Sequence, residues 1–392
     1  MLSAKLKTIT PSFTIGISTK VKELKKQGED IINLSIGEPD FSTPTEAKEG
    51  AYKAIRSNLT KYDSASGLLD LRKVIQEKLQ RENNLFYSVD EIVVSNGAKH
   101  AITNTLITLL DPGDEVLIPK PYWVSYPEMV KLTGGVPVFV DTQENNSFKA
   151  TPADIEKKIT SRTKLIILTN PSNPTGAIYS SNELLALVEL CLKHHIYILS
   201  DEIYEKICYL ETFTSTASLS EAAKEITITV NGLSKSAAMT GWRIGYTAAS
   251  KELSKAISTV QGHLISHPST ISQWASVAAL TQSEQEMEHM VSVYRERRDT
   301  AVSLLSEIEG IDFIYPEGAF YVFIDLSALA SKFHRQDSFS VTFADKLLEE
   351  AKVAVVPGIA FGMDHHIRIS YACDTKELVE GIRRIKNFIE KY

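Results

Sequence analysis

The sequence predicts an α/β fold, with a large domain on a mostly parallel central sheet and a smaller α+β domain. The middle of the chain alternates short β-rich runs with helical segments, which is the pattern of a sheet flanked by helices. Residues 165–168 are apolar without alternation, as expected for a strand covered on both faces. The C-terminal part then changes to charged, helix-prone stretches between isolated strands.

The expected elements of the large domain follow one another in a regular order. A strand at 91–96 is followed by a helix at 98–110, and the Asp-Pro-Gly-Asp turn at 111–114 leads into the next strand. A second helix, at 182–194, follows a start signal at Ser180 and Ser181. Strands are expected at residues 91–96, 115–119, 136–141, 164–169, 197–200, 226–230 and 243–248.

The smaller domain is predicted from a different mixture of elements. A helix-prone stretch around 285–309 precedes further expected elements at 320–325, 342–351, 353–356 and 366–370, and a terminal helix from Lys376. We expect residues 1–45 to join the C-terminal domain, 286–392, in space, with the large domain at 46–285. A ligand would then lie in the cleft between the domains.

Composition and charge exclude several classes of protein. Of 392 residues, 43% are hydrophobic and 23% charged, as in ordinary globular domains, and a net charge of −7 argues against nucleic acid as the main partner. The lysine-rich start reads as a solvated helix face. No long apolar run supports a membrane span, and no apolar signal core follows Met1, so we expect a cytoplasmic protein. A reducing compartment fits the three scattered cysteines, Cys191, Cys208 and Cys373.

The segment from Asn231 to Tyr246 carries the strongest chemical signal. It places Lys235 among small residues, with Arg243 following in the same segment. Desolvation lowers the pKa of a lysine and leaves a neutral amine that can condense with a carbonyl. An arginine is suited to forked recognition of phosphate. Together they suggest pyridoxal 5′-phosphate, although a buried lysine near a structural arginine remains an alternative for this segment alone.

Three further requirements of this cofactor have candidates. Asp201, at the end of an apolar strand, would keep the pyridine nitrogen protonated unless it only caps a helix, and Tyr204 would reach the ring oxygen. Asn173 lies in the turn 170–176, where two prolines forbid a helix, and offers an amide to the ring oxygen. Trp123 would stack on the ring, or would be an ordinary core residue.

A phosphate cradle and a substrate clamp complete the set. A strand-to-helix junction without the spacing of a Walker loop would direct the amides of Gly97, Ala98 and Lys99 at an anion. Arg368 lies in a short expected strand and would bind an α-carboxylate bidentately. Gly37 allows a close backbone contact because it has no side chain.

These motifs, in this order, resemble the class I/II aminotransferases of fold-type I, in particular the bacterial aspartate aminotransferase-like branch. The resemblance runs from about Thr10 to the C-terminus and includes Asn-Pro-Thr-Gly, Ser-Asp-Glu-Ile-Tyr and the lysine segment. It implies a two-domain homodimer with shared active sites, in which Tyr62 reaches the phosphate bound by the partner. One departure is Gly232, where some relatives carry a serine, so that phosphate contact would be lost or moved to Ser234.

The same resemblance implies a role for each candidate. The resemblance makes Lys235 the covalent attachment point and proton shuttle, with Asp201 on the pyridine nitrogen and Asn173 and Tyr204 on the ring oxygen. Trp123 stacks on the ring, and the phosphate contacts Gly97, Ala98, Lys99 and Arg243. The substrate-binding residues are Gly37, Lys99, Trp123, Asn173 and Arg368.

The implied reaction is ping-pong transamination with 2-oxoglutarate as acceptor. Because Lys99 would attract a second carboxylate, L-aspartate is the favoured donor. Relatives active on prephenate often carry a basic residue at the position of Thr10. The threonine therefore weakens the case for activity on prephenate without excluding it. An aromatic or broad-range aminotransferase and a C–S lyase on the same fold remain alternatives. A ligand-sensing regulator is disfavoured because we expect no appended DNA-binding domain, and a nucleotide triphosphatase because no Walker loop is present.

The sequence indicates no metal site. His194, His195, His263, His267, His365 and His366 lack the spacing of known metal-binding motifs, so we interpret them as structural or surface residues.

Overall fold

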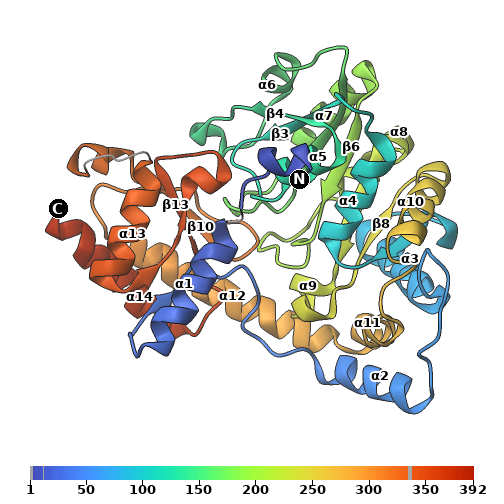
Figure 1. Cartoon of the computed structure of the whole chain (residues 1–392), viewed down its shortest axis with the longest axis horizontal. Helices are drawn as coiled ribbons and strands as arrows, with labels where there is room; N and C mark the ends of the chain where they lie inside the picture. Colours follow the sequence, from blue (N-terminus) through green and yellow to red (C-terminus); the bar gives the residue numbers. More distant parts are fainter. Residues whose placement is uncertain (1–2, 12, 334–337) are drawn as a thin grey trace.

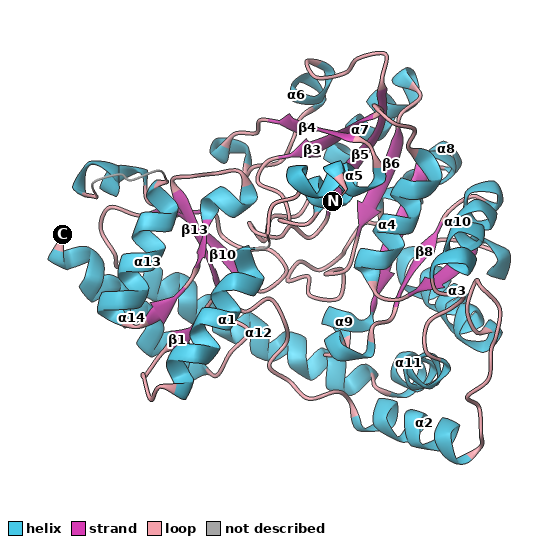
Figure 2. Ribbon diagram, viewed as in Figure 1, coloured by secondary structure: helices cyan, strands magenta, loops and turns pink. Residues whose placement is uncertain are grey.

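The computed structural model describes residues 3–11, 13–333 and 338–392 and confirms the α/β fold class (Figures 1 and 2). A seven-stranded sheet has the order β2-β8-β7-β6-β5-β3-β4, and β8 alone runs antiparallel to its neighbours. The strands are β2 (Ile92–Ser95), β3 (Glu115–Pro119), β4 (Val136–Val140), β5 (Thr163–Thr169), β6 (Tyr197–Asp201), β7 (Thr227–Gly232) and β8 (Gly245–Ala248).

Helices cover both faces of this sheet. Ile166 and Leu168 of β5 pack in one core with Leu184 of α7, whereas Leu165 and Ile167 pack in another with residues of α4 and α5. The unbroken apolar run of β5 is therefore buried on both sides, as predicted. These helices are α2 (Thr45–Arg56), α3 (Leu69–Asn83), α4 (Ala98–Leu109), α5 (Tyr126–Thr133), α6 (Pro152–Glu156), α7 (Ser181–His194), α8 (Glu221–Ile226), α9 (Leu233–Ser236), α10 (Lys251–Leu264) and α11 (Thr270–Gln282).

Local signals explain where these elements begin. Ser180 caps α7 by accepting a hydrogen bond from the Glu183 amide, which confirms the predicted start. The predicted strand 243–248 was wrong at its start, because Arg243 has a φ of 57° after the short helix η5 (Thr240–Trp242) and pairing begins at Gly245. Ile226 likewise ends α8 instead of starting β7.

A second, antiparallel sheet has the order β12-β13-β10-β9. Its strands are β9 (Asp312–Phe313), β10 (Tyr321–Asp325), β12 (Val356–Pro357) and β13 (His366–Ser370), and its helices are α1 (Phe13–Lys26), α13 (Phe339–Ala351) and α14 (Thr375–Lys391). The expected single strand at 353–356 is in fact two. Its first half, β11 (Val353–Ala354), pairs with β1 (Ile32–Asn33), whereas β12 pairs with β13.

One helix, α12 (Glu284–Leu305), joins the cores of the two sheets. Met287 packs against the core around α3 and α11, while Tyr294 and Leu305 pack in the core of the smaller sheet. In Figure 1, α12 runs from beside α11 toward α14. The division at 45 and 285 stays a prediction, and the β1–β11 pair brings the N-terminal segment to the C-terminal part.

Short 3₁₀ helices connect several elements: η1 (Ala4–Thr8), η2 (Val89–Glu91), η3 (Glu144–Asn146), η4 (Thr216–Leu219), η6 (Ser327–Lys332) and η7 (Gly358–Phe361). Among the described residues, no helix has both the length and the apolar character needed to cross a membrane.

Candidate active site

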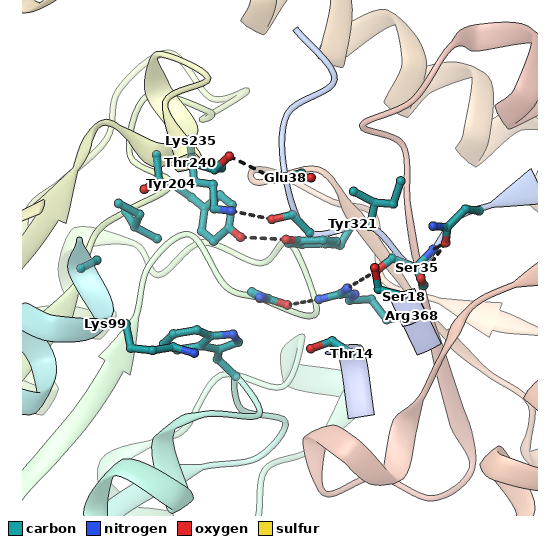
Figure 3. Close-up of a pocket in the computed structure, with 18 of the residues that line it drawn as sticks. Thr14, Ser18, Ser35, Glu38, Lys99, Tyr204, Lys235, Thr240, Tyr321 and Arg368 are labelled. Atoms are coloured by element: carbon teal, nitrogen blue, oxygen red, sulfur yellow. Dashed lines mark hydrogen bonds between the residues drawn. The ribbon is translucent and has the colours of Figure 1, made fainter. Parts of the chain in front are cut away.

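A cavity of about 620 Å³ lies at the carboxyl edge of the large sheet (Figure 3). The strands β3, β5, β6 and β7 end there, and their following residues line it, as an α/β sheet with parallel strands requires. Ser35 and Tyr321 line it from the side of the smaller sheet. Of the residues predicted from sequence, the lining includes Gly37, Ala98, Lys99, Trp123, Asn173, Asp201, Tyr204, Lys235, Arg243 and Arg368.

Lys235 reaches the cavity from α9, directly after β7. Its Nζ donates a hydrogen bond to the carbonyl oxygen of Gly37. Burial lowers the pKa of Lys235 to about 8, against the opposing effect of the Glu38 carboxylate. A lysine with such a pKa is partly neutral near physiological pH and can act as a nucleophile or base.

Asp201 ends β6 and is buried, with 3% of its surface exposed. The hydroxyl of Tyr126 donates a 2.6 Å hydrogen bond to it, and the Ile203 amide donates one of 3.3 Å. Burial raises the pKa of Asp201 to about 6, and the Tyr126 hydrogen bond opposes that rise. A turn follows Asp201, so the helix-capping alternative does not apply.

Arg368 lies across the cavity from Lys99 (Figure 3) and contacts Asn173. The Arg368 guanidinium donates hydrogen bonds of 3.0 Å to the Asn173 side-chain oxygen and to the Ser35 carbonyl, and its Nε has no hydrogen-bond partner among the described residues. It lies over the Tyr321 ring, 4.2 Å from the centroid. Burial lowers its pKa, and the charges that oppose this effect belong to Tyr321 and Tyr204, not to a carboxylate. The site therefore holds a buried cation suited to an anionic ligand.

Tyr204 forms part of the same wall. Its hydroxyl lies 2.8 Å from that of Tyr321, and burial raises the pKa values of both phenols. Both are therefore protonated at neutral pH and can donate hydrogen bonds to an acceptor in the cavity.

The predicted anion cradle lies where β2 turns into α4. Gly97 has a φ of +87°, and a Cβ there would come within 2.5 Å of Nη2 of Arg243. The absence of a side chain thus lets the guanidinium approach the N-terminus of α4, and Ala98 and Ser234 line the cavity beside it. At Gly232, a Cβ would lie 2.7 Å from the Ile244 carbonyl oxygen, so this backbone leaves no room for a serine, whereas Ser234 faces the cavity.

Lys99 lines another wall of the cavity (Figure 3), next to Trp123. The Nζ of Lys99 is 5.0 Å from the centroid of the Trp123 ring. Burial, and then the positive charge of Arg243, lower the pKa of Lys99. Trp123 also packs edge-on against Tyr126, the residue whose hydroxyl is hydrogen-bonded to Asp201.

Sequence reasoning missed several residues of this cavity. Tyr126 and Tyr321 carried no chemical signal in the sequence, because one lies in an expected turn and the other in an expected strand. Glu38, beside Gly37, accepts a 3.0 Å hydrogen bond from Thr240. The N-terminal helix was read as a solvated face, yet it also lines the cavity with Thr14, Ser18, Val21, Lys22 and Lys25.

Tyr62 lies outside the cavity. Its side chain is 91% exposed and packs edge-on against His267. Its predicted contact needs a second chain and stays a prediction.

Comparison with known proteins agrees with this geometry. The family model "Aminotransferase class I and II" matches residues 29–385. The aspartate aminotransferase of Bacillus subtilis is 44% identical over 392 residues, covering 100% of this chain and 99% of the relative. A probable aspartate/prephenate aminotransferase of Aquifex aeolicus is 45% identical, with coverage of 100% and 99%. The solved aspartate aminotransferase of Thermus thermophilus with maleate matches with a TM-score of 0.93 at 41% identity, covering 99% of each chain. With its lysine, aspartate and arginine placed around one cavity, the chain belongs to the class I and II aminotransferases.

Proposed function

We propose that this protein is a pyridoxal 5′-phosphate-dependent aspartate aminotransferase that transfers the amino group of L-aspartate to 2-oxoglutarate. The observation that carries the proposal is the convergence of Lys235, Asp201 and Arg368 on one cavity. An amine of lowered pKa, a buried carboxylate and a buried guanidinium without a carboxylate partner are the groups that this chemistry needs.

The residues present fit the cofactor. Within the described part of the chain, the buried Asp201 carboxylate accepts hydrogen bonds from two neutral groups, Tyr126 and the Ile203 amide, and so suits a protonated ring nitrogen. The Gly97 backbone leaves a cradle at a helix N-terminus beside Arg243, which suits a phosphate. Trp123 offers an aromatic face, and Asn173 and Tyr204 offer polar groups for a ring oxygen.

When bound, pyridoxal phosphate supplies an aldehyde for the amino group and a ring that accepts electron density from the substrate. Lys235 would hold the cofactor covalently, and its buried amine of lowered pKa would accept and return the proton of the substrate α-carbon. Asp201 would maintain positive charge at the ring nitrogen. Arg368 orients the substrate through its α-carboxylate, which fixes the α-hydrogen relative to the Lys235 amine.

Preference for a dicarboxylic substrate rests on Lys99. Its ammonium lies on the wall that faces Arg368 across the cavity, where a second carboxylate would arrive (Figure 3). The names of the Bacillus subtilis and Thermus thermophilus relatives support aspartate as donor. Prephenate is a second candidate acceptor because the Aquifex aeolicus relative is named for it.

We further propose a cytoplasmic homodimer with shared active sites. The exposed Tyr62 supports the shared site, because a residue with this exposure is free to reach a partner chain. The cavity, lined from both the large sheet and the smaller one, supports the proposed division into domains 1–45 with 286–392, and 46–285.

The test is a substrate panel with product analysis. Protein saturated with the cofactor is mixed with aspartate, tyrosine, phenylalanine or alanine, each with 2-oxoglutarate or prephenate. We expect oxaloacetate and glutamate as products, with the highest kcat/KM for aspartate. A preference for tyrosine or phenylalanine would instead identify an aromatic enzyme. Cystathionine is assayed separately without an acceptor, and release of a thiol, pyruvate and ammonia from it would identify a C–S lyase.

A further inference from the structure

Three side chains outside the cavity form a cluster with metal-ligating atoms. Glu144 begins η3 after β4 of the large sheet, and Asp325 and His366 are paired across β10 and β13 of the smaller sheet. One ligand atom from each residue lies within 4.8 Å of the others. None of the three lines the active-site cavity.

His366 is the informative member of this cluster. Only 6% of its surface is exposed, and neither ring nitrogen has a hydrogen-bond partner among the described residues. The ring stacks on Phe323 at 4.7 Å and meets the edge of Phe148 at 5.5 Å, so its position is set by packing. An unpartnered buried imidazole is costly, and its Nε2 faces Asp325 at 4.0 Å, which is too long for a hydrogen bond.

The charges of the cluster indicate which kind of ligand it would bind. Two of the three side chains in the cluster, Glu144 and Asp325, are carboxylates. Asp325 accepts hydrogen bonds of 2.8 and 2.5 Å from the amide and hydroxyl of Ser327, which orient its carboxylate. Two carboxylates and an imidazole without a hydrogen-bond partner among the described residues favour a bound cation.

We propose that Glu144, Asp325 and His366 form a binding site for a divalent transition metal of the Zn²⁺ class. Imidazole nitrogen and carboxylate oxygen bind Zn²⁺ at about 2.0–2.2 Å, which places adjacent ligand atoms roughly 3–3.5 Å apart. The cluster needs only a modest contraction to reach that spacing. The half-buried Glu144, in the short helix η3, is the ligand that would have to shift toward the other two. An imidazole ligand disfavours Ca²⁺ and Mg²⁺, which prefer oxygen.

A metal at this position would connect the two sheets. Glu144 follows the edge strand of the large sheet, and the other two ligands belong to the smaller sheet. His366 is also two positions from Arg368 on β13, on the same face of that strand. Zn²⁺ would therefore fix the strand that carries the proposed carboxylate clamp.

Direct measurement of metal binding tests the site. Untagged protein, freed of unbound cofactor, is dialysed against Zn²⁺ and then analysed by atomic emission and calorimetry. We expect one Zn²⁺ per chain and a rise in Tm with Zn²⁺ concentration. Glu144→Gln, Asp325→Asn and His366→Gln should each weaken binding at least tenfold. The matched controls, Glu189→Gln and His195→Gln on the exposed surface of α7 and at its end, should bind as the parent protein does.

Other results would overturn the site. It is wrong if the parent protein retains no stoichiometric Zn²⁺, or if Glu144→Gln binds Zn²⁺ as tightly as Glu189→Gln. Because Glu144 is half-buried on a turn, its variant stays informative if His366→Gln fails to fold. Equal affinity for Ca²⁺ and Zn²⁺ would show that the imidazole is not a ligand and would exclude the proposed metal class.

Discussion

The hydroxyl of Tyr126 donates a 2.6 Å hydrogen bond to the carboxylate of Asp201, and both residues are buried. Tyr126 also lies 2.7 Å from the Thr169 hydroxyl, at the end of the neighbouring strand β5. This phenol therefore joins the ends of two strands and stabilises the charged form of Asp201, because a hydrogen bond to a carboxylate opposes its protonation.

Tyr126→Phe should make cofactor binding more sensitive to acid. The pKa of Asp201 is about 6 in the cofactor-free protein, and only the ionised form suits a cationic ring nitrogen. Without the phenol that pKa rises, so affinity for pyridoxal phosphate should begin to fall at a higher pH, by about one unit. Titration of cofactor absorbance between pH 5 and 8 measures this shift. Tyr197→Phe, at the far end of β6, is the control. Identical profiles for both variants would contradict this role.

Covalent capture of the cofactor should depend on the ionisation of Lys235. Burial lowers the pKa of Lys235 from its ordinary value to about 8, so the amine is mostly protonated at pH 6 and mostly neutral at pH 9. The rate of capture by the cofactor-free protein should therefore rise across pH 8. Stopped-flow absorbance gives the rate, and borohydride reduction with mass spectrometry locates the linkage. Lys235→Ala should abolish linkage and turnover. Full turnover by that variant would refute the assignment.

Arg368→Gln should weaken the binding of every α-carboxylate substrate. The variant leaves the Asn173 oxygen and the Ser35 carbonyl without their donor and removes the buried positive charge. Truncating one partner of a buried charged pair costs about 2–5 kcal/mol, so kcat/KM should fall on the order of 10²-fold or more for aspartate and alanine alike. Arg383→Gln, on the exposed face of α14, should leave both values unchanged. A loss confined to aspartate would assign Arg368 to the other carboxylate.

Lys99→Gln should separate aspartate from alanine. A hydrogen bond to a charged group contributes about 1.5–3 kcal/mol, so kcat/KM for aspartate should fall by roughly ten- to a hundredfold. Alanine has no distal carboxylate, and its kcat/KM should change little. Steady-state assays with both donors give the ratio. Unchanged kcat/KM for aspartate would remove the basis for the proposed specificity.

Tyr62→Phe should reduce cofactor affinity only if the protein is a dimer. The side chain is 91% exposed in the single chain and does not line its cavity, so any effect on phosphate binding must come through a partner. We expect a sedimenting dimer and a several-fold higher Kd for pyridoxal phosphate. Tyr315→Phe, at another exposed phenol, is the control. A monomer in solution would contradict the shared site.

Much of the fold could be predicted because its signals are local. The apolar run 165–168 indicated a strand covered on both faces, and the Ser180 signal located the start of α7. Where a local signal was weak, the prediction failed. The continuous apolar run at 353–356 gave no sign that its halves pair in two different sheets, because pairing partners are set by distant segments.

The residues of the site also fall into those that local sequence patterns locate and those that only the tertiary structure brings together. The sequence by itself determined that Lys235, Asp201 and Asn173 follow strand ends of an α/β sheet, because turn and strand patterns are local and parallel strands present those ends at one edge. Only the tertiary structure placed Tyr126 on Asp201 and brought Glu144 beside His366. These contacts join residues far apart in the chain, and no spacing in a sequence encodes a distance between two sheets.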